Sequence, residues 1–136
     1  TSETGENIDR IKKVIEECWP GELTIIFKAN EEFTEKFDSG LKTVGIRIPK
    51  NRTAIDIIKN TGGIVLTTSA NISGEKAVTD IKDISEVLLS EVDGIITDNS
   101  ILTGVPSTII KYVEGEIEIL REGNINIEKI KQLMKG

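Results

Sequence analysis

Histidine is absent from the 136-residue sequence, and this absence excludes several common chemistries. Histidine is the most frequent general base and the most frequent metal ligand in proteins, so a Ser-His nucleophile pair and a histidine-based metal site are both excluded. The sequence also lacks a Gly-x-Ser-x-Gly elbow and a Gly-x-x-x-x-Gly-Lys-Ser/Thr phosphate loop. Any chemistry therefore depends on hydroxyl, amide, carboxylate, lysine and arginine groups, which suit catalysis by positioning and charge stabilisation.

Cysteine, aromatic residues and long apolar runs are scarce as well. Cys18 is the single cysteine, so no internal disulfide can form, and its place on the apolar side of a predicted helix favours a buried structural thiol. No apolar run approaches the roughly 20 residues of a membrane helix, and no signal-like segment is present, so we expect no membrane association and a cytoplasmic location. The net charge of -6 disfavours a large nucleic-acid interface but leaves room for a local basic pocket.

The hydrophobic pattern predicts alternating helices and strands in a single domain, residues 1–136. Helices are expected over residues 8–18, 51–60, 78–89 and 127–134, with Asn7 and Asn126 as N-caps, and a short helix within residues 31–41 is expected to end at Ser39-Gly40. Strands are expected over residues 23–27, 44–49, 64–66, 93–98, 104–110 and 116–121, and the last two form a hairpin through Glu114-Gly115. This order predicts an α/β layer with a mixed sheet.

Two of the predicted strands alternate clearly between apolar and other residues. In the strand over 44–49, Val44, Ile46 and Ile48 share one face, which leaves Gly45 and Arg47 on the other. Arg47 is therefore either an ordinary solvent-facing arginine or a guanidinium above a cavity floored by Gly45. In the last strand, Ile117 and Ile119 are expected to face inward, and Glu118 and Leu120 outward.

Hydroxyl, amide and guanidinium groups gather at the ends of the predicted strands. Thr67, Ser69 and Asn71 follow the apolar run 64–66, which reads as a buried strand, and such a loop either faces a ligand crevice or forms an ordinary polar turn. Ser107 precedes Thr108 at another strand end, and Arg121 ends the last strand. If these segments converge with Arg47, the pocket suits carboxylate and phosphate oxygens. Trp19 and Thr24 are more simply read as a core anchor and a strand former.

Five motifs in this order resemble the Sua5/YrdC/TsaC family, and together they span most of the chain. They are Pro20-Gly21-Glu22-Leu23-Thr24, Val44-Gly45-Ile46-Arg47-Ile48-Pro49, Thr67-Thr68-Ser69-Ala70-Asn71-Ile72-Ser73-Gly74, Pro106-Ser107-Thr108 and Leu120-Arg121-Glu122-Gly123. The resemblance implies an L-threonylcarbamoyladenylate synthase, a nucleotidyltransferase that joins L-threonine, bicarbonate and ATP into threonylcarbamoyl-AMP with release of pyrophosphate. This reaction begins the t6A modification of tRNA. The implied fold is a twisted mixed sheet, flanked by helices, around a concave, positively charged cavity.

The same resemblance implies roles for individual residues. Arg47 and Ser107 correspond to contacts with the threonine part of substrate or product. The positions that correspond to nucleotide contacts are Thr43, Thr67, Ser69, Asn71, Ala77 and Arg121, with Ala77 acting through its backbone. Mg²⁺ is expected with ATP, and neither a protein metal site nor a catalytic acid, base or nucleophile is implied. The implied partners are the small-molecule substrates and other t6A pathway proteins.

The sequence also departs from the family pattern. Family members begin with a strand carrying a Pro-Thr-x-Thr-Val-Tyr-Gly-like string and a Lys-x-Arg pair, and neither is present here. We therefore expect an N-terminally incomplete domain that has little or no activity alone. Glu22 stands where the family usually has a second proline. The alternatives are a non-catalytic RNA-binding or regulatory domain, because this fold has been associated with double-stranded RNA and tRNA, and a core that binds nothing and self-associates through an open sheet edge.

Overall fold

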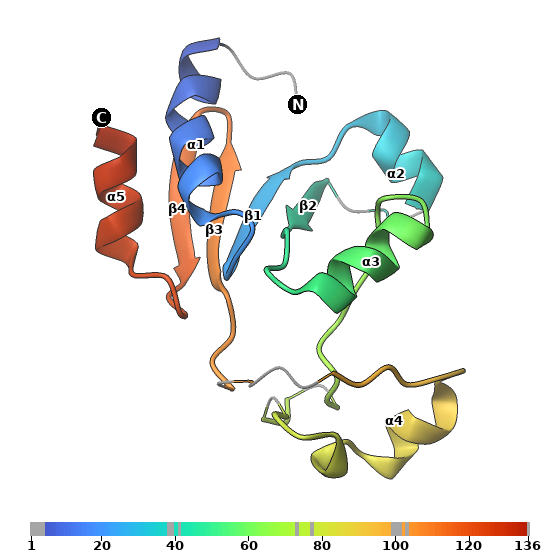
Figure 1. Ribbon diagram of the computed structural model, residues 1–136. Coiled ribbons are helices and arrows are strands. Elements are labelled where there is room, and N and C mark those ends of the chain that lie inside the picture. Colours follow the sequence, from blue (N-terminus) through green and yellow to red (C-terminus); the bar gives the residue numbers. More distant parts are fainter. Residues whose placement is uncertain are drawn as a thin grey trace. The chain divides into compact units, whose positions relative to one another are not determined.

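The protein forms two compact units, Thr1–Lys50 with Ser107–Gly136 (unit 1) and Asn51–Pro106 (unit 2). The structure is a computed structural model that describes residues 5–37, 40, 42–72, 74–76, 78–98, 102 and 104–135. Figure 1 shows the helices and strands of both units. The single domain predicted over residues 1–136 requires these two units to pack together. The single domain therefore stays a prediction.

Unit 1 contains a four-stranded mixed sheet in the order β2-β1-β3-β4. Its strands are β1 (Leu23–Lys28), β2 (Thr43–Ile46), β3 (Thr108–Val113) and β4 (Glu116–Arg121). β1 pairs in parallel with β3, and the β1–β2 and β3–β4 pairs are antiparallel. The predicted mixed sheet and the predicted hairpin of β3 and β4 are therefore confirmed. β3 begins at Thr108, later than expected, because Pro106 has no N–H for a strand ladder.

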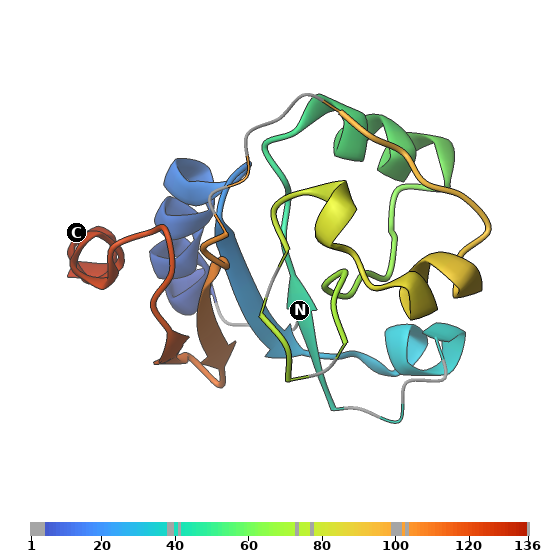
Figure 2. The same cartoon turned by 90° about the horizontal axis from the view of Figure 1, so that it is seen from below.

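Two helices of unit 1, α1 (Gly5–Cys18) and α5 (Ile127–Lys135), lie side by side on one face of the sheet (Figures 1 and 2). The predicted cap of α5 is confirmed, because the Asn126 side chain accepts a hydrogen bond from the Glu128 N–H at 2.8 Å. The predicted cap of the first helix is wrong, since α1 begins at Gly5 and includes Asn7. The third helix, α2 (Glu31–Phe37), ends before Ser39, which lies outside the described residues.

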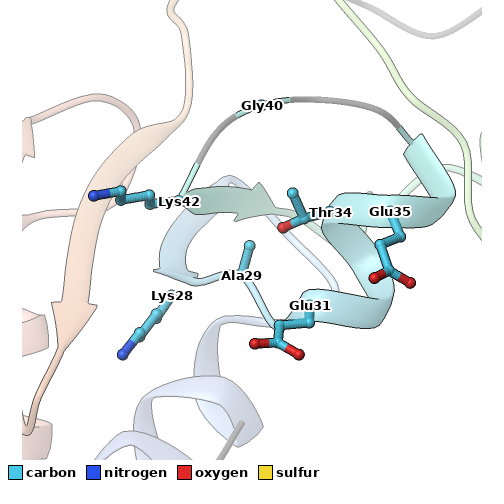
Figure 3. A pocket seen from close by; sticks show the side chains of 7 residues that line it. All are labelled: Lys28, Ala29, Glu31, Thr34, Glu35, Gly40 and Lys42. Carbon is cyan, nitrogen blue, oxygen red and sulfur yellow. The ribbon is translucent and has the colours of Figure 1, made fainter.

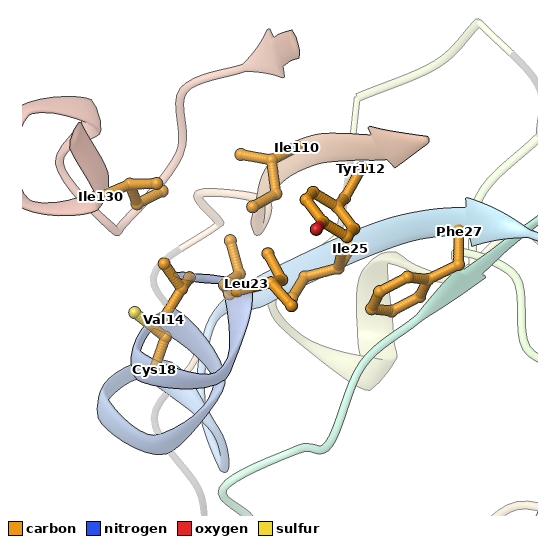
Figure 4. Close-up of a cluster of buried hydrophobic side chains, with 9 residues drawn as sticks. Val14, Cys18, Leu23, Ile25, Phe27, Ile110, Tyr112 and Ile130 are labelled. Atoms are coloured by element: carbon orange, nitrogen blue, oxygen red, sulfur yellow. The ribbon is translucent and has the colours of Figure 1, made fainter. Parts of the chain in front are cut away.

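The core of unit 1 lies between the two helices and the sheet (Figure 4). Alternate residues of β1 and β3 point into it, because successive side chains of a strand face opposite sides. The buried apolar residues are Ile11, Val14, Cys18, Leu23, Ile25, Phe27, Ile110, Tyr112 and Ile130. Ile117 and Ile119 pack against this cluster as expected, and Trp19 anchors the turn before β1 by donating from Nε1 to the Leu23 carbonyl at 2.7 Å.

The second strand differs from its prediction in length and burial. β2 ends at Ile46, so Arg47, Ile48 and Pro49 lie outside it. Val44 pairs with Phe27 and Ile46 with Ile25, so the predicted shared face is present. Ile46 and Ile48 are nevertheless both 41% exposed. The helices cover β1 and β3, and no residue of the edge strand β2 belongs to the buried cluster among the described residues.

Unit 2 contains α3 (Arg52–Asn60), a single 3₁₀ turn η1 (Ile81–Asp83) and α4 (Glu86–Glu91). The predicted helix over residues 51–60 is confirmed, and the Asn51 side chain caps α3 by accepting a hydrogen bond from the Ala54 N–H. The single helix predicted over residues 78–89 is wrong. The Ser85 hydroxyl accepts from the Val87 N–H, so this residue caps a new helix and separates α4 from η1.

The two strands predicted in unit 2, residues 64–66 and 93–98, are also wrong. Both segments lack regular structure, and Ile64 and Ile96 are 58% and 68% exposed. An apolar run becomes a strand only where a neighbouring strand pairs with its backbone, and within the described residues the sheet contains only β1 to β4. Among the helices that the structure describes, none has the length and apolar character of a membrane span.

Candidate functional site

The predicted site residues fall into three groups. Arg47, Thr43, Ser107 and Arg121 belong to unit 1, and a loop of unit 2 carries the predicted nucleotide contacts Thr67, Ser69 and Asn71. Ala77 lies outside the described residues. Ser107 and Arg121 are in direct contact within unit 1.

A row of residues across the polar face of the sheet organises the site in unit 1. Leu23 and Ile25 point into the core, so Thr24 faces the opposite side of β1. Thr24 pairs with Ile109 of β3, and Ile109 pairs with Arg121 of β4. Ile46 pairs with Ile25 at the end of β2, and the Gly21 N–H then donates to the Ile48 carbonyl, so the register of this pair shifts before Arg47. The row of paired residues therefore ends with Arg121 on β4, whereas Arg47 lies just beyond β2, beside the turn that precedes β1.

A β-bulge turns Arg121 onto this polar face. Strict alternation from Ile117 and Ile119 would direct Arg121 into the core. Instead, the register shifts: Ile119 pairs with Ile110, and Arg121 pairs with the adjacent Ile109, so Leu120 is an extra residue. The bulge moves the side chain of Arg121 from the core face to the face of Thr24. Strand alternation alone could not predict this change.

Ser107 lies between Thr24 and Arg121 and contacts both. Its Oγ is 2.8 Å from Oγ1 of Thr24, within hydrogen-bond distance. Its backbone carbonyl accepts two hydrogen bonds from Arg121, from Nε at 3.1 Å and from Nη2 at 2.9 Å. Ser107 is only 9% exposed, whereas Arg121 is exposed. The guanidinium group is therefore held by a neutral carbonyl while part of its surface stays open to a ligand.

The neighbouring hydroxyl, on Thr108, holds this arrangement from the core side. Thr108 is fully buried, and its Oγ1 donates to the Ile125 carbonyl at 2.7 Å. The same oxygen accepts from the N–H groups of Gly123 and Ile125, at 2.9 and 3.1 Å. The loop that follows Arg121 is thus fastened to the start of β3. Thr108 therefore positions Ser107 and Arg121 without facing the ligand side itself.

Arg47 is held by the turn that precedes β1. Its Nε donates to the Gly21 carbonyl at 3.0 Å, and its Nη2 donates to Oε1 of Glu22 at 2.8 Å. The Gly21 N–H in turn donates to the Ile48 carbonyl at 2.8 Å, so the turn and the Arg47 segment are tied at two points. Gly21 cannot carry a side chain here, because a Cβ would lie 2.6 Å from the Cys18 carbonyl oxygen.

Thr43 lies apart from the other three residues of unit 1. It pairs with Lys28, four residues along β1 from Thr24, which corresponds to about 13 Å. Beside this end of β1 is a cavity of about 360 Å³, shown in Figure 3. The residues that line it are Lys28, Ala29, Glu31, Thr34, Glu35, Gly40 and Lys42. Among the residues that the structure describes, no predicted site residue lines this cavity.

The loop of unit 2 presents exposed hydroxyl groups around one anchoring amide. Thr67 and Ser69 are exposed. The Asn71 side chain donates from Nδ2 to the carbonyls of Glu75 and Ile72, at 2.9 and 3.2 Å, and so closes the loop. Its Oδ1 is buried and has no hydrogen-bond partner among the described residues. Asn71 therefore shapes the loop and retains one acceptor for a donor group.

The two arginines of unit 1 differ in charge compensation. Arg47 forms an ion pair with Glu22, whereas Arg121 has no carboxylate within 4 Å among the described residues. In the same part of the chain, no cluster of His, Cys, Asp or Glu side chains could hold a metal ion. Burial raises the pKa of the Cys18 thiol, opposed by Lys129 and assisted by Glu17, so this cysteine is a poor nucleophile.

Sequence reasoning missed two residues of this site, Thr24 and Glu22, and did not predict the supporting role of a third, Thr108. Thr24 was interpreted as a strand former, but its hydroxyl contacts Ser107. The sequence pattern groups the Thr108 hydroxyl with that of Ser107 among the pocket donors, but Thr108 is fully buried and its hydroxyl bonds to Gly123 and Ile125. Glu22 was noted as a departure from the family pattern, and no local signal identified Arg47 as its partner.

Comparisons with known proteins find relatives that are named threonylcarbamoyl-AMP synthase. A putative threonylcarbamoyl-AMP synthase of Methanocaldococcus jannaschii is 37% identical over 123 residues, which are 90% of this chain and 56% of that protein. The threonylcarbamoyl-AMP synthase of Bacillus subtilis is 29% identical over 132 residues, which are 96% of this chain and 38% of that protein. The chain thus spans between about one third and just over one half of the relatives that it matches.

A solved structure and a family model agree with these relatives. The crystal structure of P. abyssi Sua5 complexed with L-threonine matches with a TM-score of 0.83 and 28% identity, over 98% of this chain and 38% of that chain. The family model Sua5_yciO_yrdC, described as telomere recombination, matches residues 2–123. This match includes every predicted site residue, and the mixed sheet with its flanking helices is the fold that the resemblance implied. The chain therefore belongs to the Sua5/YciO/YrdC family.

Proposed function

We propose that this chain is part of an L-threonylcarbamoyladenylate synthase and that its unit 1 binds both the amino acid and the nucleotide. The reaction would join L-threonine, bicarbonate and ATP into threonylcarbamoyl-AMP, with release of pyrophosphate, for t6A modification of tRNA. Two findings support the proposal: relatives are named threonylcarbamoyl-AMP synthase, and a structural neighbour was solved with L-threonine.

The arrangement of Arg121 is the observation that carries the proposal. Its guanidinium is fixed by two hydrogen bonds to a neutral carbonyl, and no carboxylate among the described residues compensates its charge. A fixed, uncompensated guanidinium is suited to phosphate oxygens and to the charge that develops during phosphoryl chemistry. We therefore assign the nucleotide phosphates to Arg121. Thr43, Thr67, Ser69, Asn71 and Ala77 remain proposed nucleotide contacts on the basis of the resemblance.

Arg47 and Ser107 would hold the threonine part. In threonylcarbamoyl-AMP the amino-acid carboxylate carbon lies five bonds from the phosphorus, so one ligand needs two anion sites with polar groups between them. Unit 1 provides two arginines, Arg47 beside the turn before β1 and Arg121 on β4, and the contacting hydroxyls of Thr24 and Ser107 supply the polar groups. The chain's own residues thus position the ligand, and none acts as a nucleophile.

Mg²⁺ would enter as part of the substrate, bound to ATP. The described residues contain no cluster of acidic, histidine or cysteine side chains for a resident metal ion. Mg²⁺ needs few protein ligands when phosphate oxygens and water complete its octahedral shell, so the exposed hydroxyls of this chain are compatible with a nucleotide-borne ion. When bound, Mg²⁺ would neutralise charge on the departing pyrophosphate.

Calorimetric titration with Mg-ATP and with L-threonine tests the proposal. Arg121→Ala should weaken Mg-ATP binding at least about tenfold, because it removes charge-assisted hydrogen bonds to phosphate. Arg47→Ala should weaken L-threonine binding more than Mg-ATP binding. Arg52→Ala is the matched control, because it removes an exposed arginine from α3. Equal Mg-ATP affinities of the Arg121→Ala and Arg52→Ala variants would contradict the proposal.

A further inference from the structure

The ion pair between Arg47 and Glu22 occupies one edge of the Arg47 guanidinium. Nε and Nη2 point to the same side of this planar group, and their acceptors are Gly21 O at 3.0 Å and Glu22 Oε1 at 2.8 Å. Two oxygens from consecutive residues thus stand where the two oxygens of a bound carboxylate would stand. The remaining N–H groups, including those of Nη1, have no hydrogen-bond partner among the described residues.

The backbone fixes Glu22 in this place. The Glu22 carbonyl accepts from the Thr108 N–H at 3.0 Å, and the preceding Gly21 is tied to Ile48 on the segment that carries Arg47. The pair itself is exposed, with side-chain exposures of 37% for Arg47 and 40% for Glu22. Solvent-exposed ion pairs contribute little to folding. The main effect of Glu22 is therefore on the charge that a ligand meets at Arg47.

The second arginine, Arg121, differs from Arg47 because no acidic side chain compensates its charge among the residues that the structure describes. Arg121 donates to the neutral Ser107 carbonyl and has no carboxylate within 4 Å in the described part of the chain, so it keeps its full positive charge. Arg47 together with Glu22 has no net charge. A ligand that approaches Arg47 meets a guanidinium edge for hydrogen bonds but also a carboxylate a few ångströms away. Repulsion from that carboxylate grows with the charge of the ligand.

We infer that Glu22 is a specificity-determining residue that keeps phosphate groups away from Arg47 and so reserves this arginine for the singly charged carboxylate of an amino acid. The inference rests on the proposed function, in which both anions bind in unit 1. The polyanionic phosphates then bind at Arg121, where no acid opposes them. The ligand is thereby bound in one orientation, although both anion sites carry the same type of side chain.

NMR spectroscopy of the arginine Nε–H groups tests the inference on the whole 136-residue chain. The chain has four arginines, and the variants Arg47→Lys and Arg121→Lys assign the two signals of interest. Inorganic pyrophosphate and L-threonine are the two probes, titrated separately into the unsubstituted protein and into Glu22→Gln. Glutamine keeps an oxygen acceptor for Nη2 and removes only the charge. Glu32→Gln is the matched control, because it removes an exposed charge elsewhere in unit 1.

In the unsubstituted protein, pyrophosphate should shift the Arg121 signal at concentrations about tenfold lower than it needs at Arg47. Glu22→Gln should tighten pyrophosphate binding at Arg47 about tenfold and L-threonine binding by about fourfold or less, because a polyanion is repelled more strongly. Arg121 should change less than about twofold. Glu22→Ala repeats the test without a side-chain acceptor, in case the amide itself alters the turn.

Two results would overturn the inference: an unchanged pyrophosphate response of Arg47 in Glu22→Gln, or an equal gain in Glu32→Gln. The proposed function fails separately, if Arg121 does not respond to pyrophosphate in any of these proteins. A response of Arg121 without any effect of Glu22→Gln would leave the proposed function in place and remove only the role of Glu22. No response at Arg47 to either probe would also count against the inference.

Discussion

A single buried hydroxyl, on Thr108, connects three backbone groups that hold the candidate site together. Its Oγ1 takes part in hydrogen bonds with the Gly123 N–H, the Ile125 N–H and the Ile125 carbonyl. Thr108→Val keeps the shape of the side chain but leaves these groups without their partner. We expect a loss of about 2–3 kcal/mol in the free energy of unfolding, measured by urea denaturation, and weaker Mg-ATP binding. Thr108→Ser is the control, since it keeps the hydroxyl; equal losses in both variants would show that the hydroxyl is unimportant.

Cys18 should make stability fall at alkaline pH. Burial holds the pKa of the folded thiol above its ordinary value, which the unfolded chain retains. At pH values below the ordinary thiol pKa, Cys18 is protonated in both the folded and the unfolded chain, so the free energy of unfolding keeps its full value. As pH rises through this pKa, only the unfolded chain loses its proton, so the free energy of unfolding decreases. Under reducing conditions we expect this free energy to fall more steeply between about pH 8 and 9.5 than in Cys18→Ala. Parallel curves for the two proteins would contradict the expectation.

At the scale of elements, the β3–β4 hairpin determines where Arg121 lies. Its two turn residues, Glu114 and Gly115, have φ values of 55° and 78°, as a two-residue turn of type I′ requires. Positive φ is costly for glutamate and acceptable for asparagine. We therefore expect Glu114→Asn to raise the free energy of unfolding by about 0.5–1 kcal/mol, as measured by thermal and urea denaturation. Glu114→Ala removes the same charge without the conformational gain, so equal stability of the two variants would refute the explanation.

The elements that the sequence predicted correctly are those with signals inside the element. Apolar residues at helical spacing together with the Asn126 cap predicted α5, and strict alternation with a Glu-Gly turn predicted the hairpin. The strands expected over residues 64–66 and 93–98 failed because a short apolar run does not reveal whether another strand will pair with it. The candidate site shows the same contrast between local signals and contacts of distant segments. The types of residue were visible, but the bulge at Leu120 and the pairing of Glu22 with Arg47 depend on register and on contacts between distant segments.

At the scale of the whole molecule, burial is unequal between the two units. Every residue classed as buried in the described part of the chain belongs to unit 1, and the described residues of unit 2 are half-buried or exposed. Large apolar side chains are exposed in unit 2, among them Leu66, Val87 and Ile96, at 64% or more. Local opening of a segment costs little where few apolar contacts are lost. The proposed nucleotide loop, residues 67–71, therefore belongs to the less protected unit.

Hydrogen exchange followed by mass spectrometry measures this difference directly. The amides of β1 and β3 in unit 1 should exchange only on global unfolding, because each strand has partners on both sides and packs on the core. The amides of residues 64–72 and 92–98 in unit 2 should exchange at least about a hundredfold faster, since these segments have neither strand partners nor buried side chains among the described residues. If Mg-ATP binds the loop as proposed, saturating Mg-ATP should slow exchange at residues 67–72, whereas L-threonine alone should not. Slow exchange of this loop in the free protein would contradict this expectation. It would mean that contacts other than the burial of described side chains stabilise unit 2.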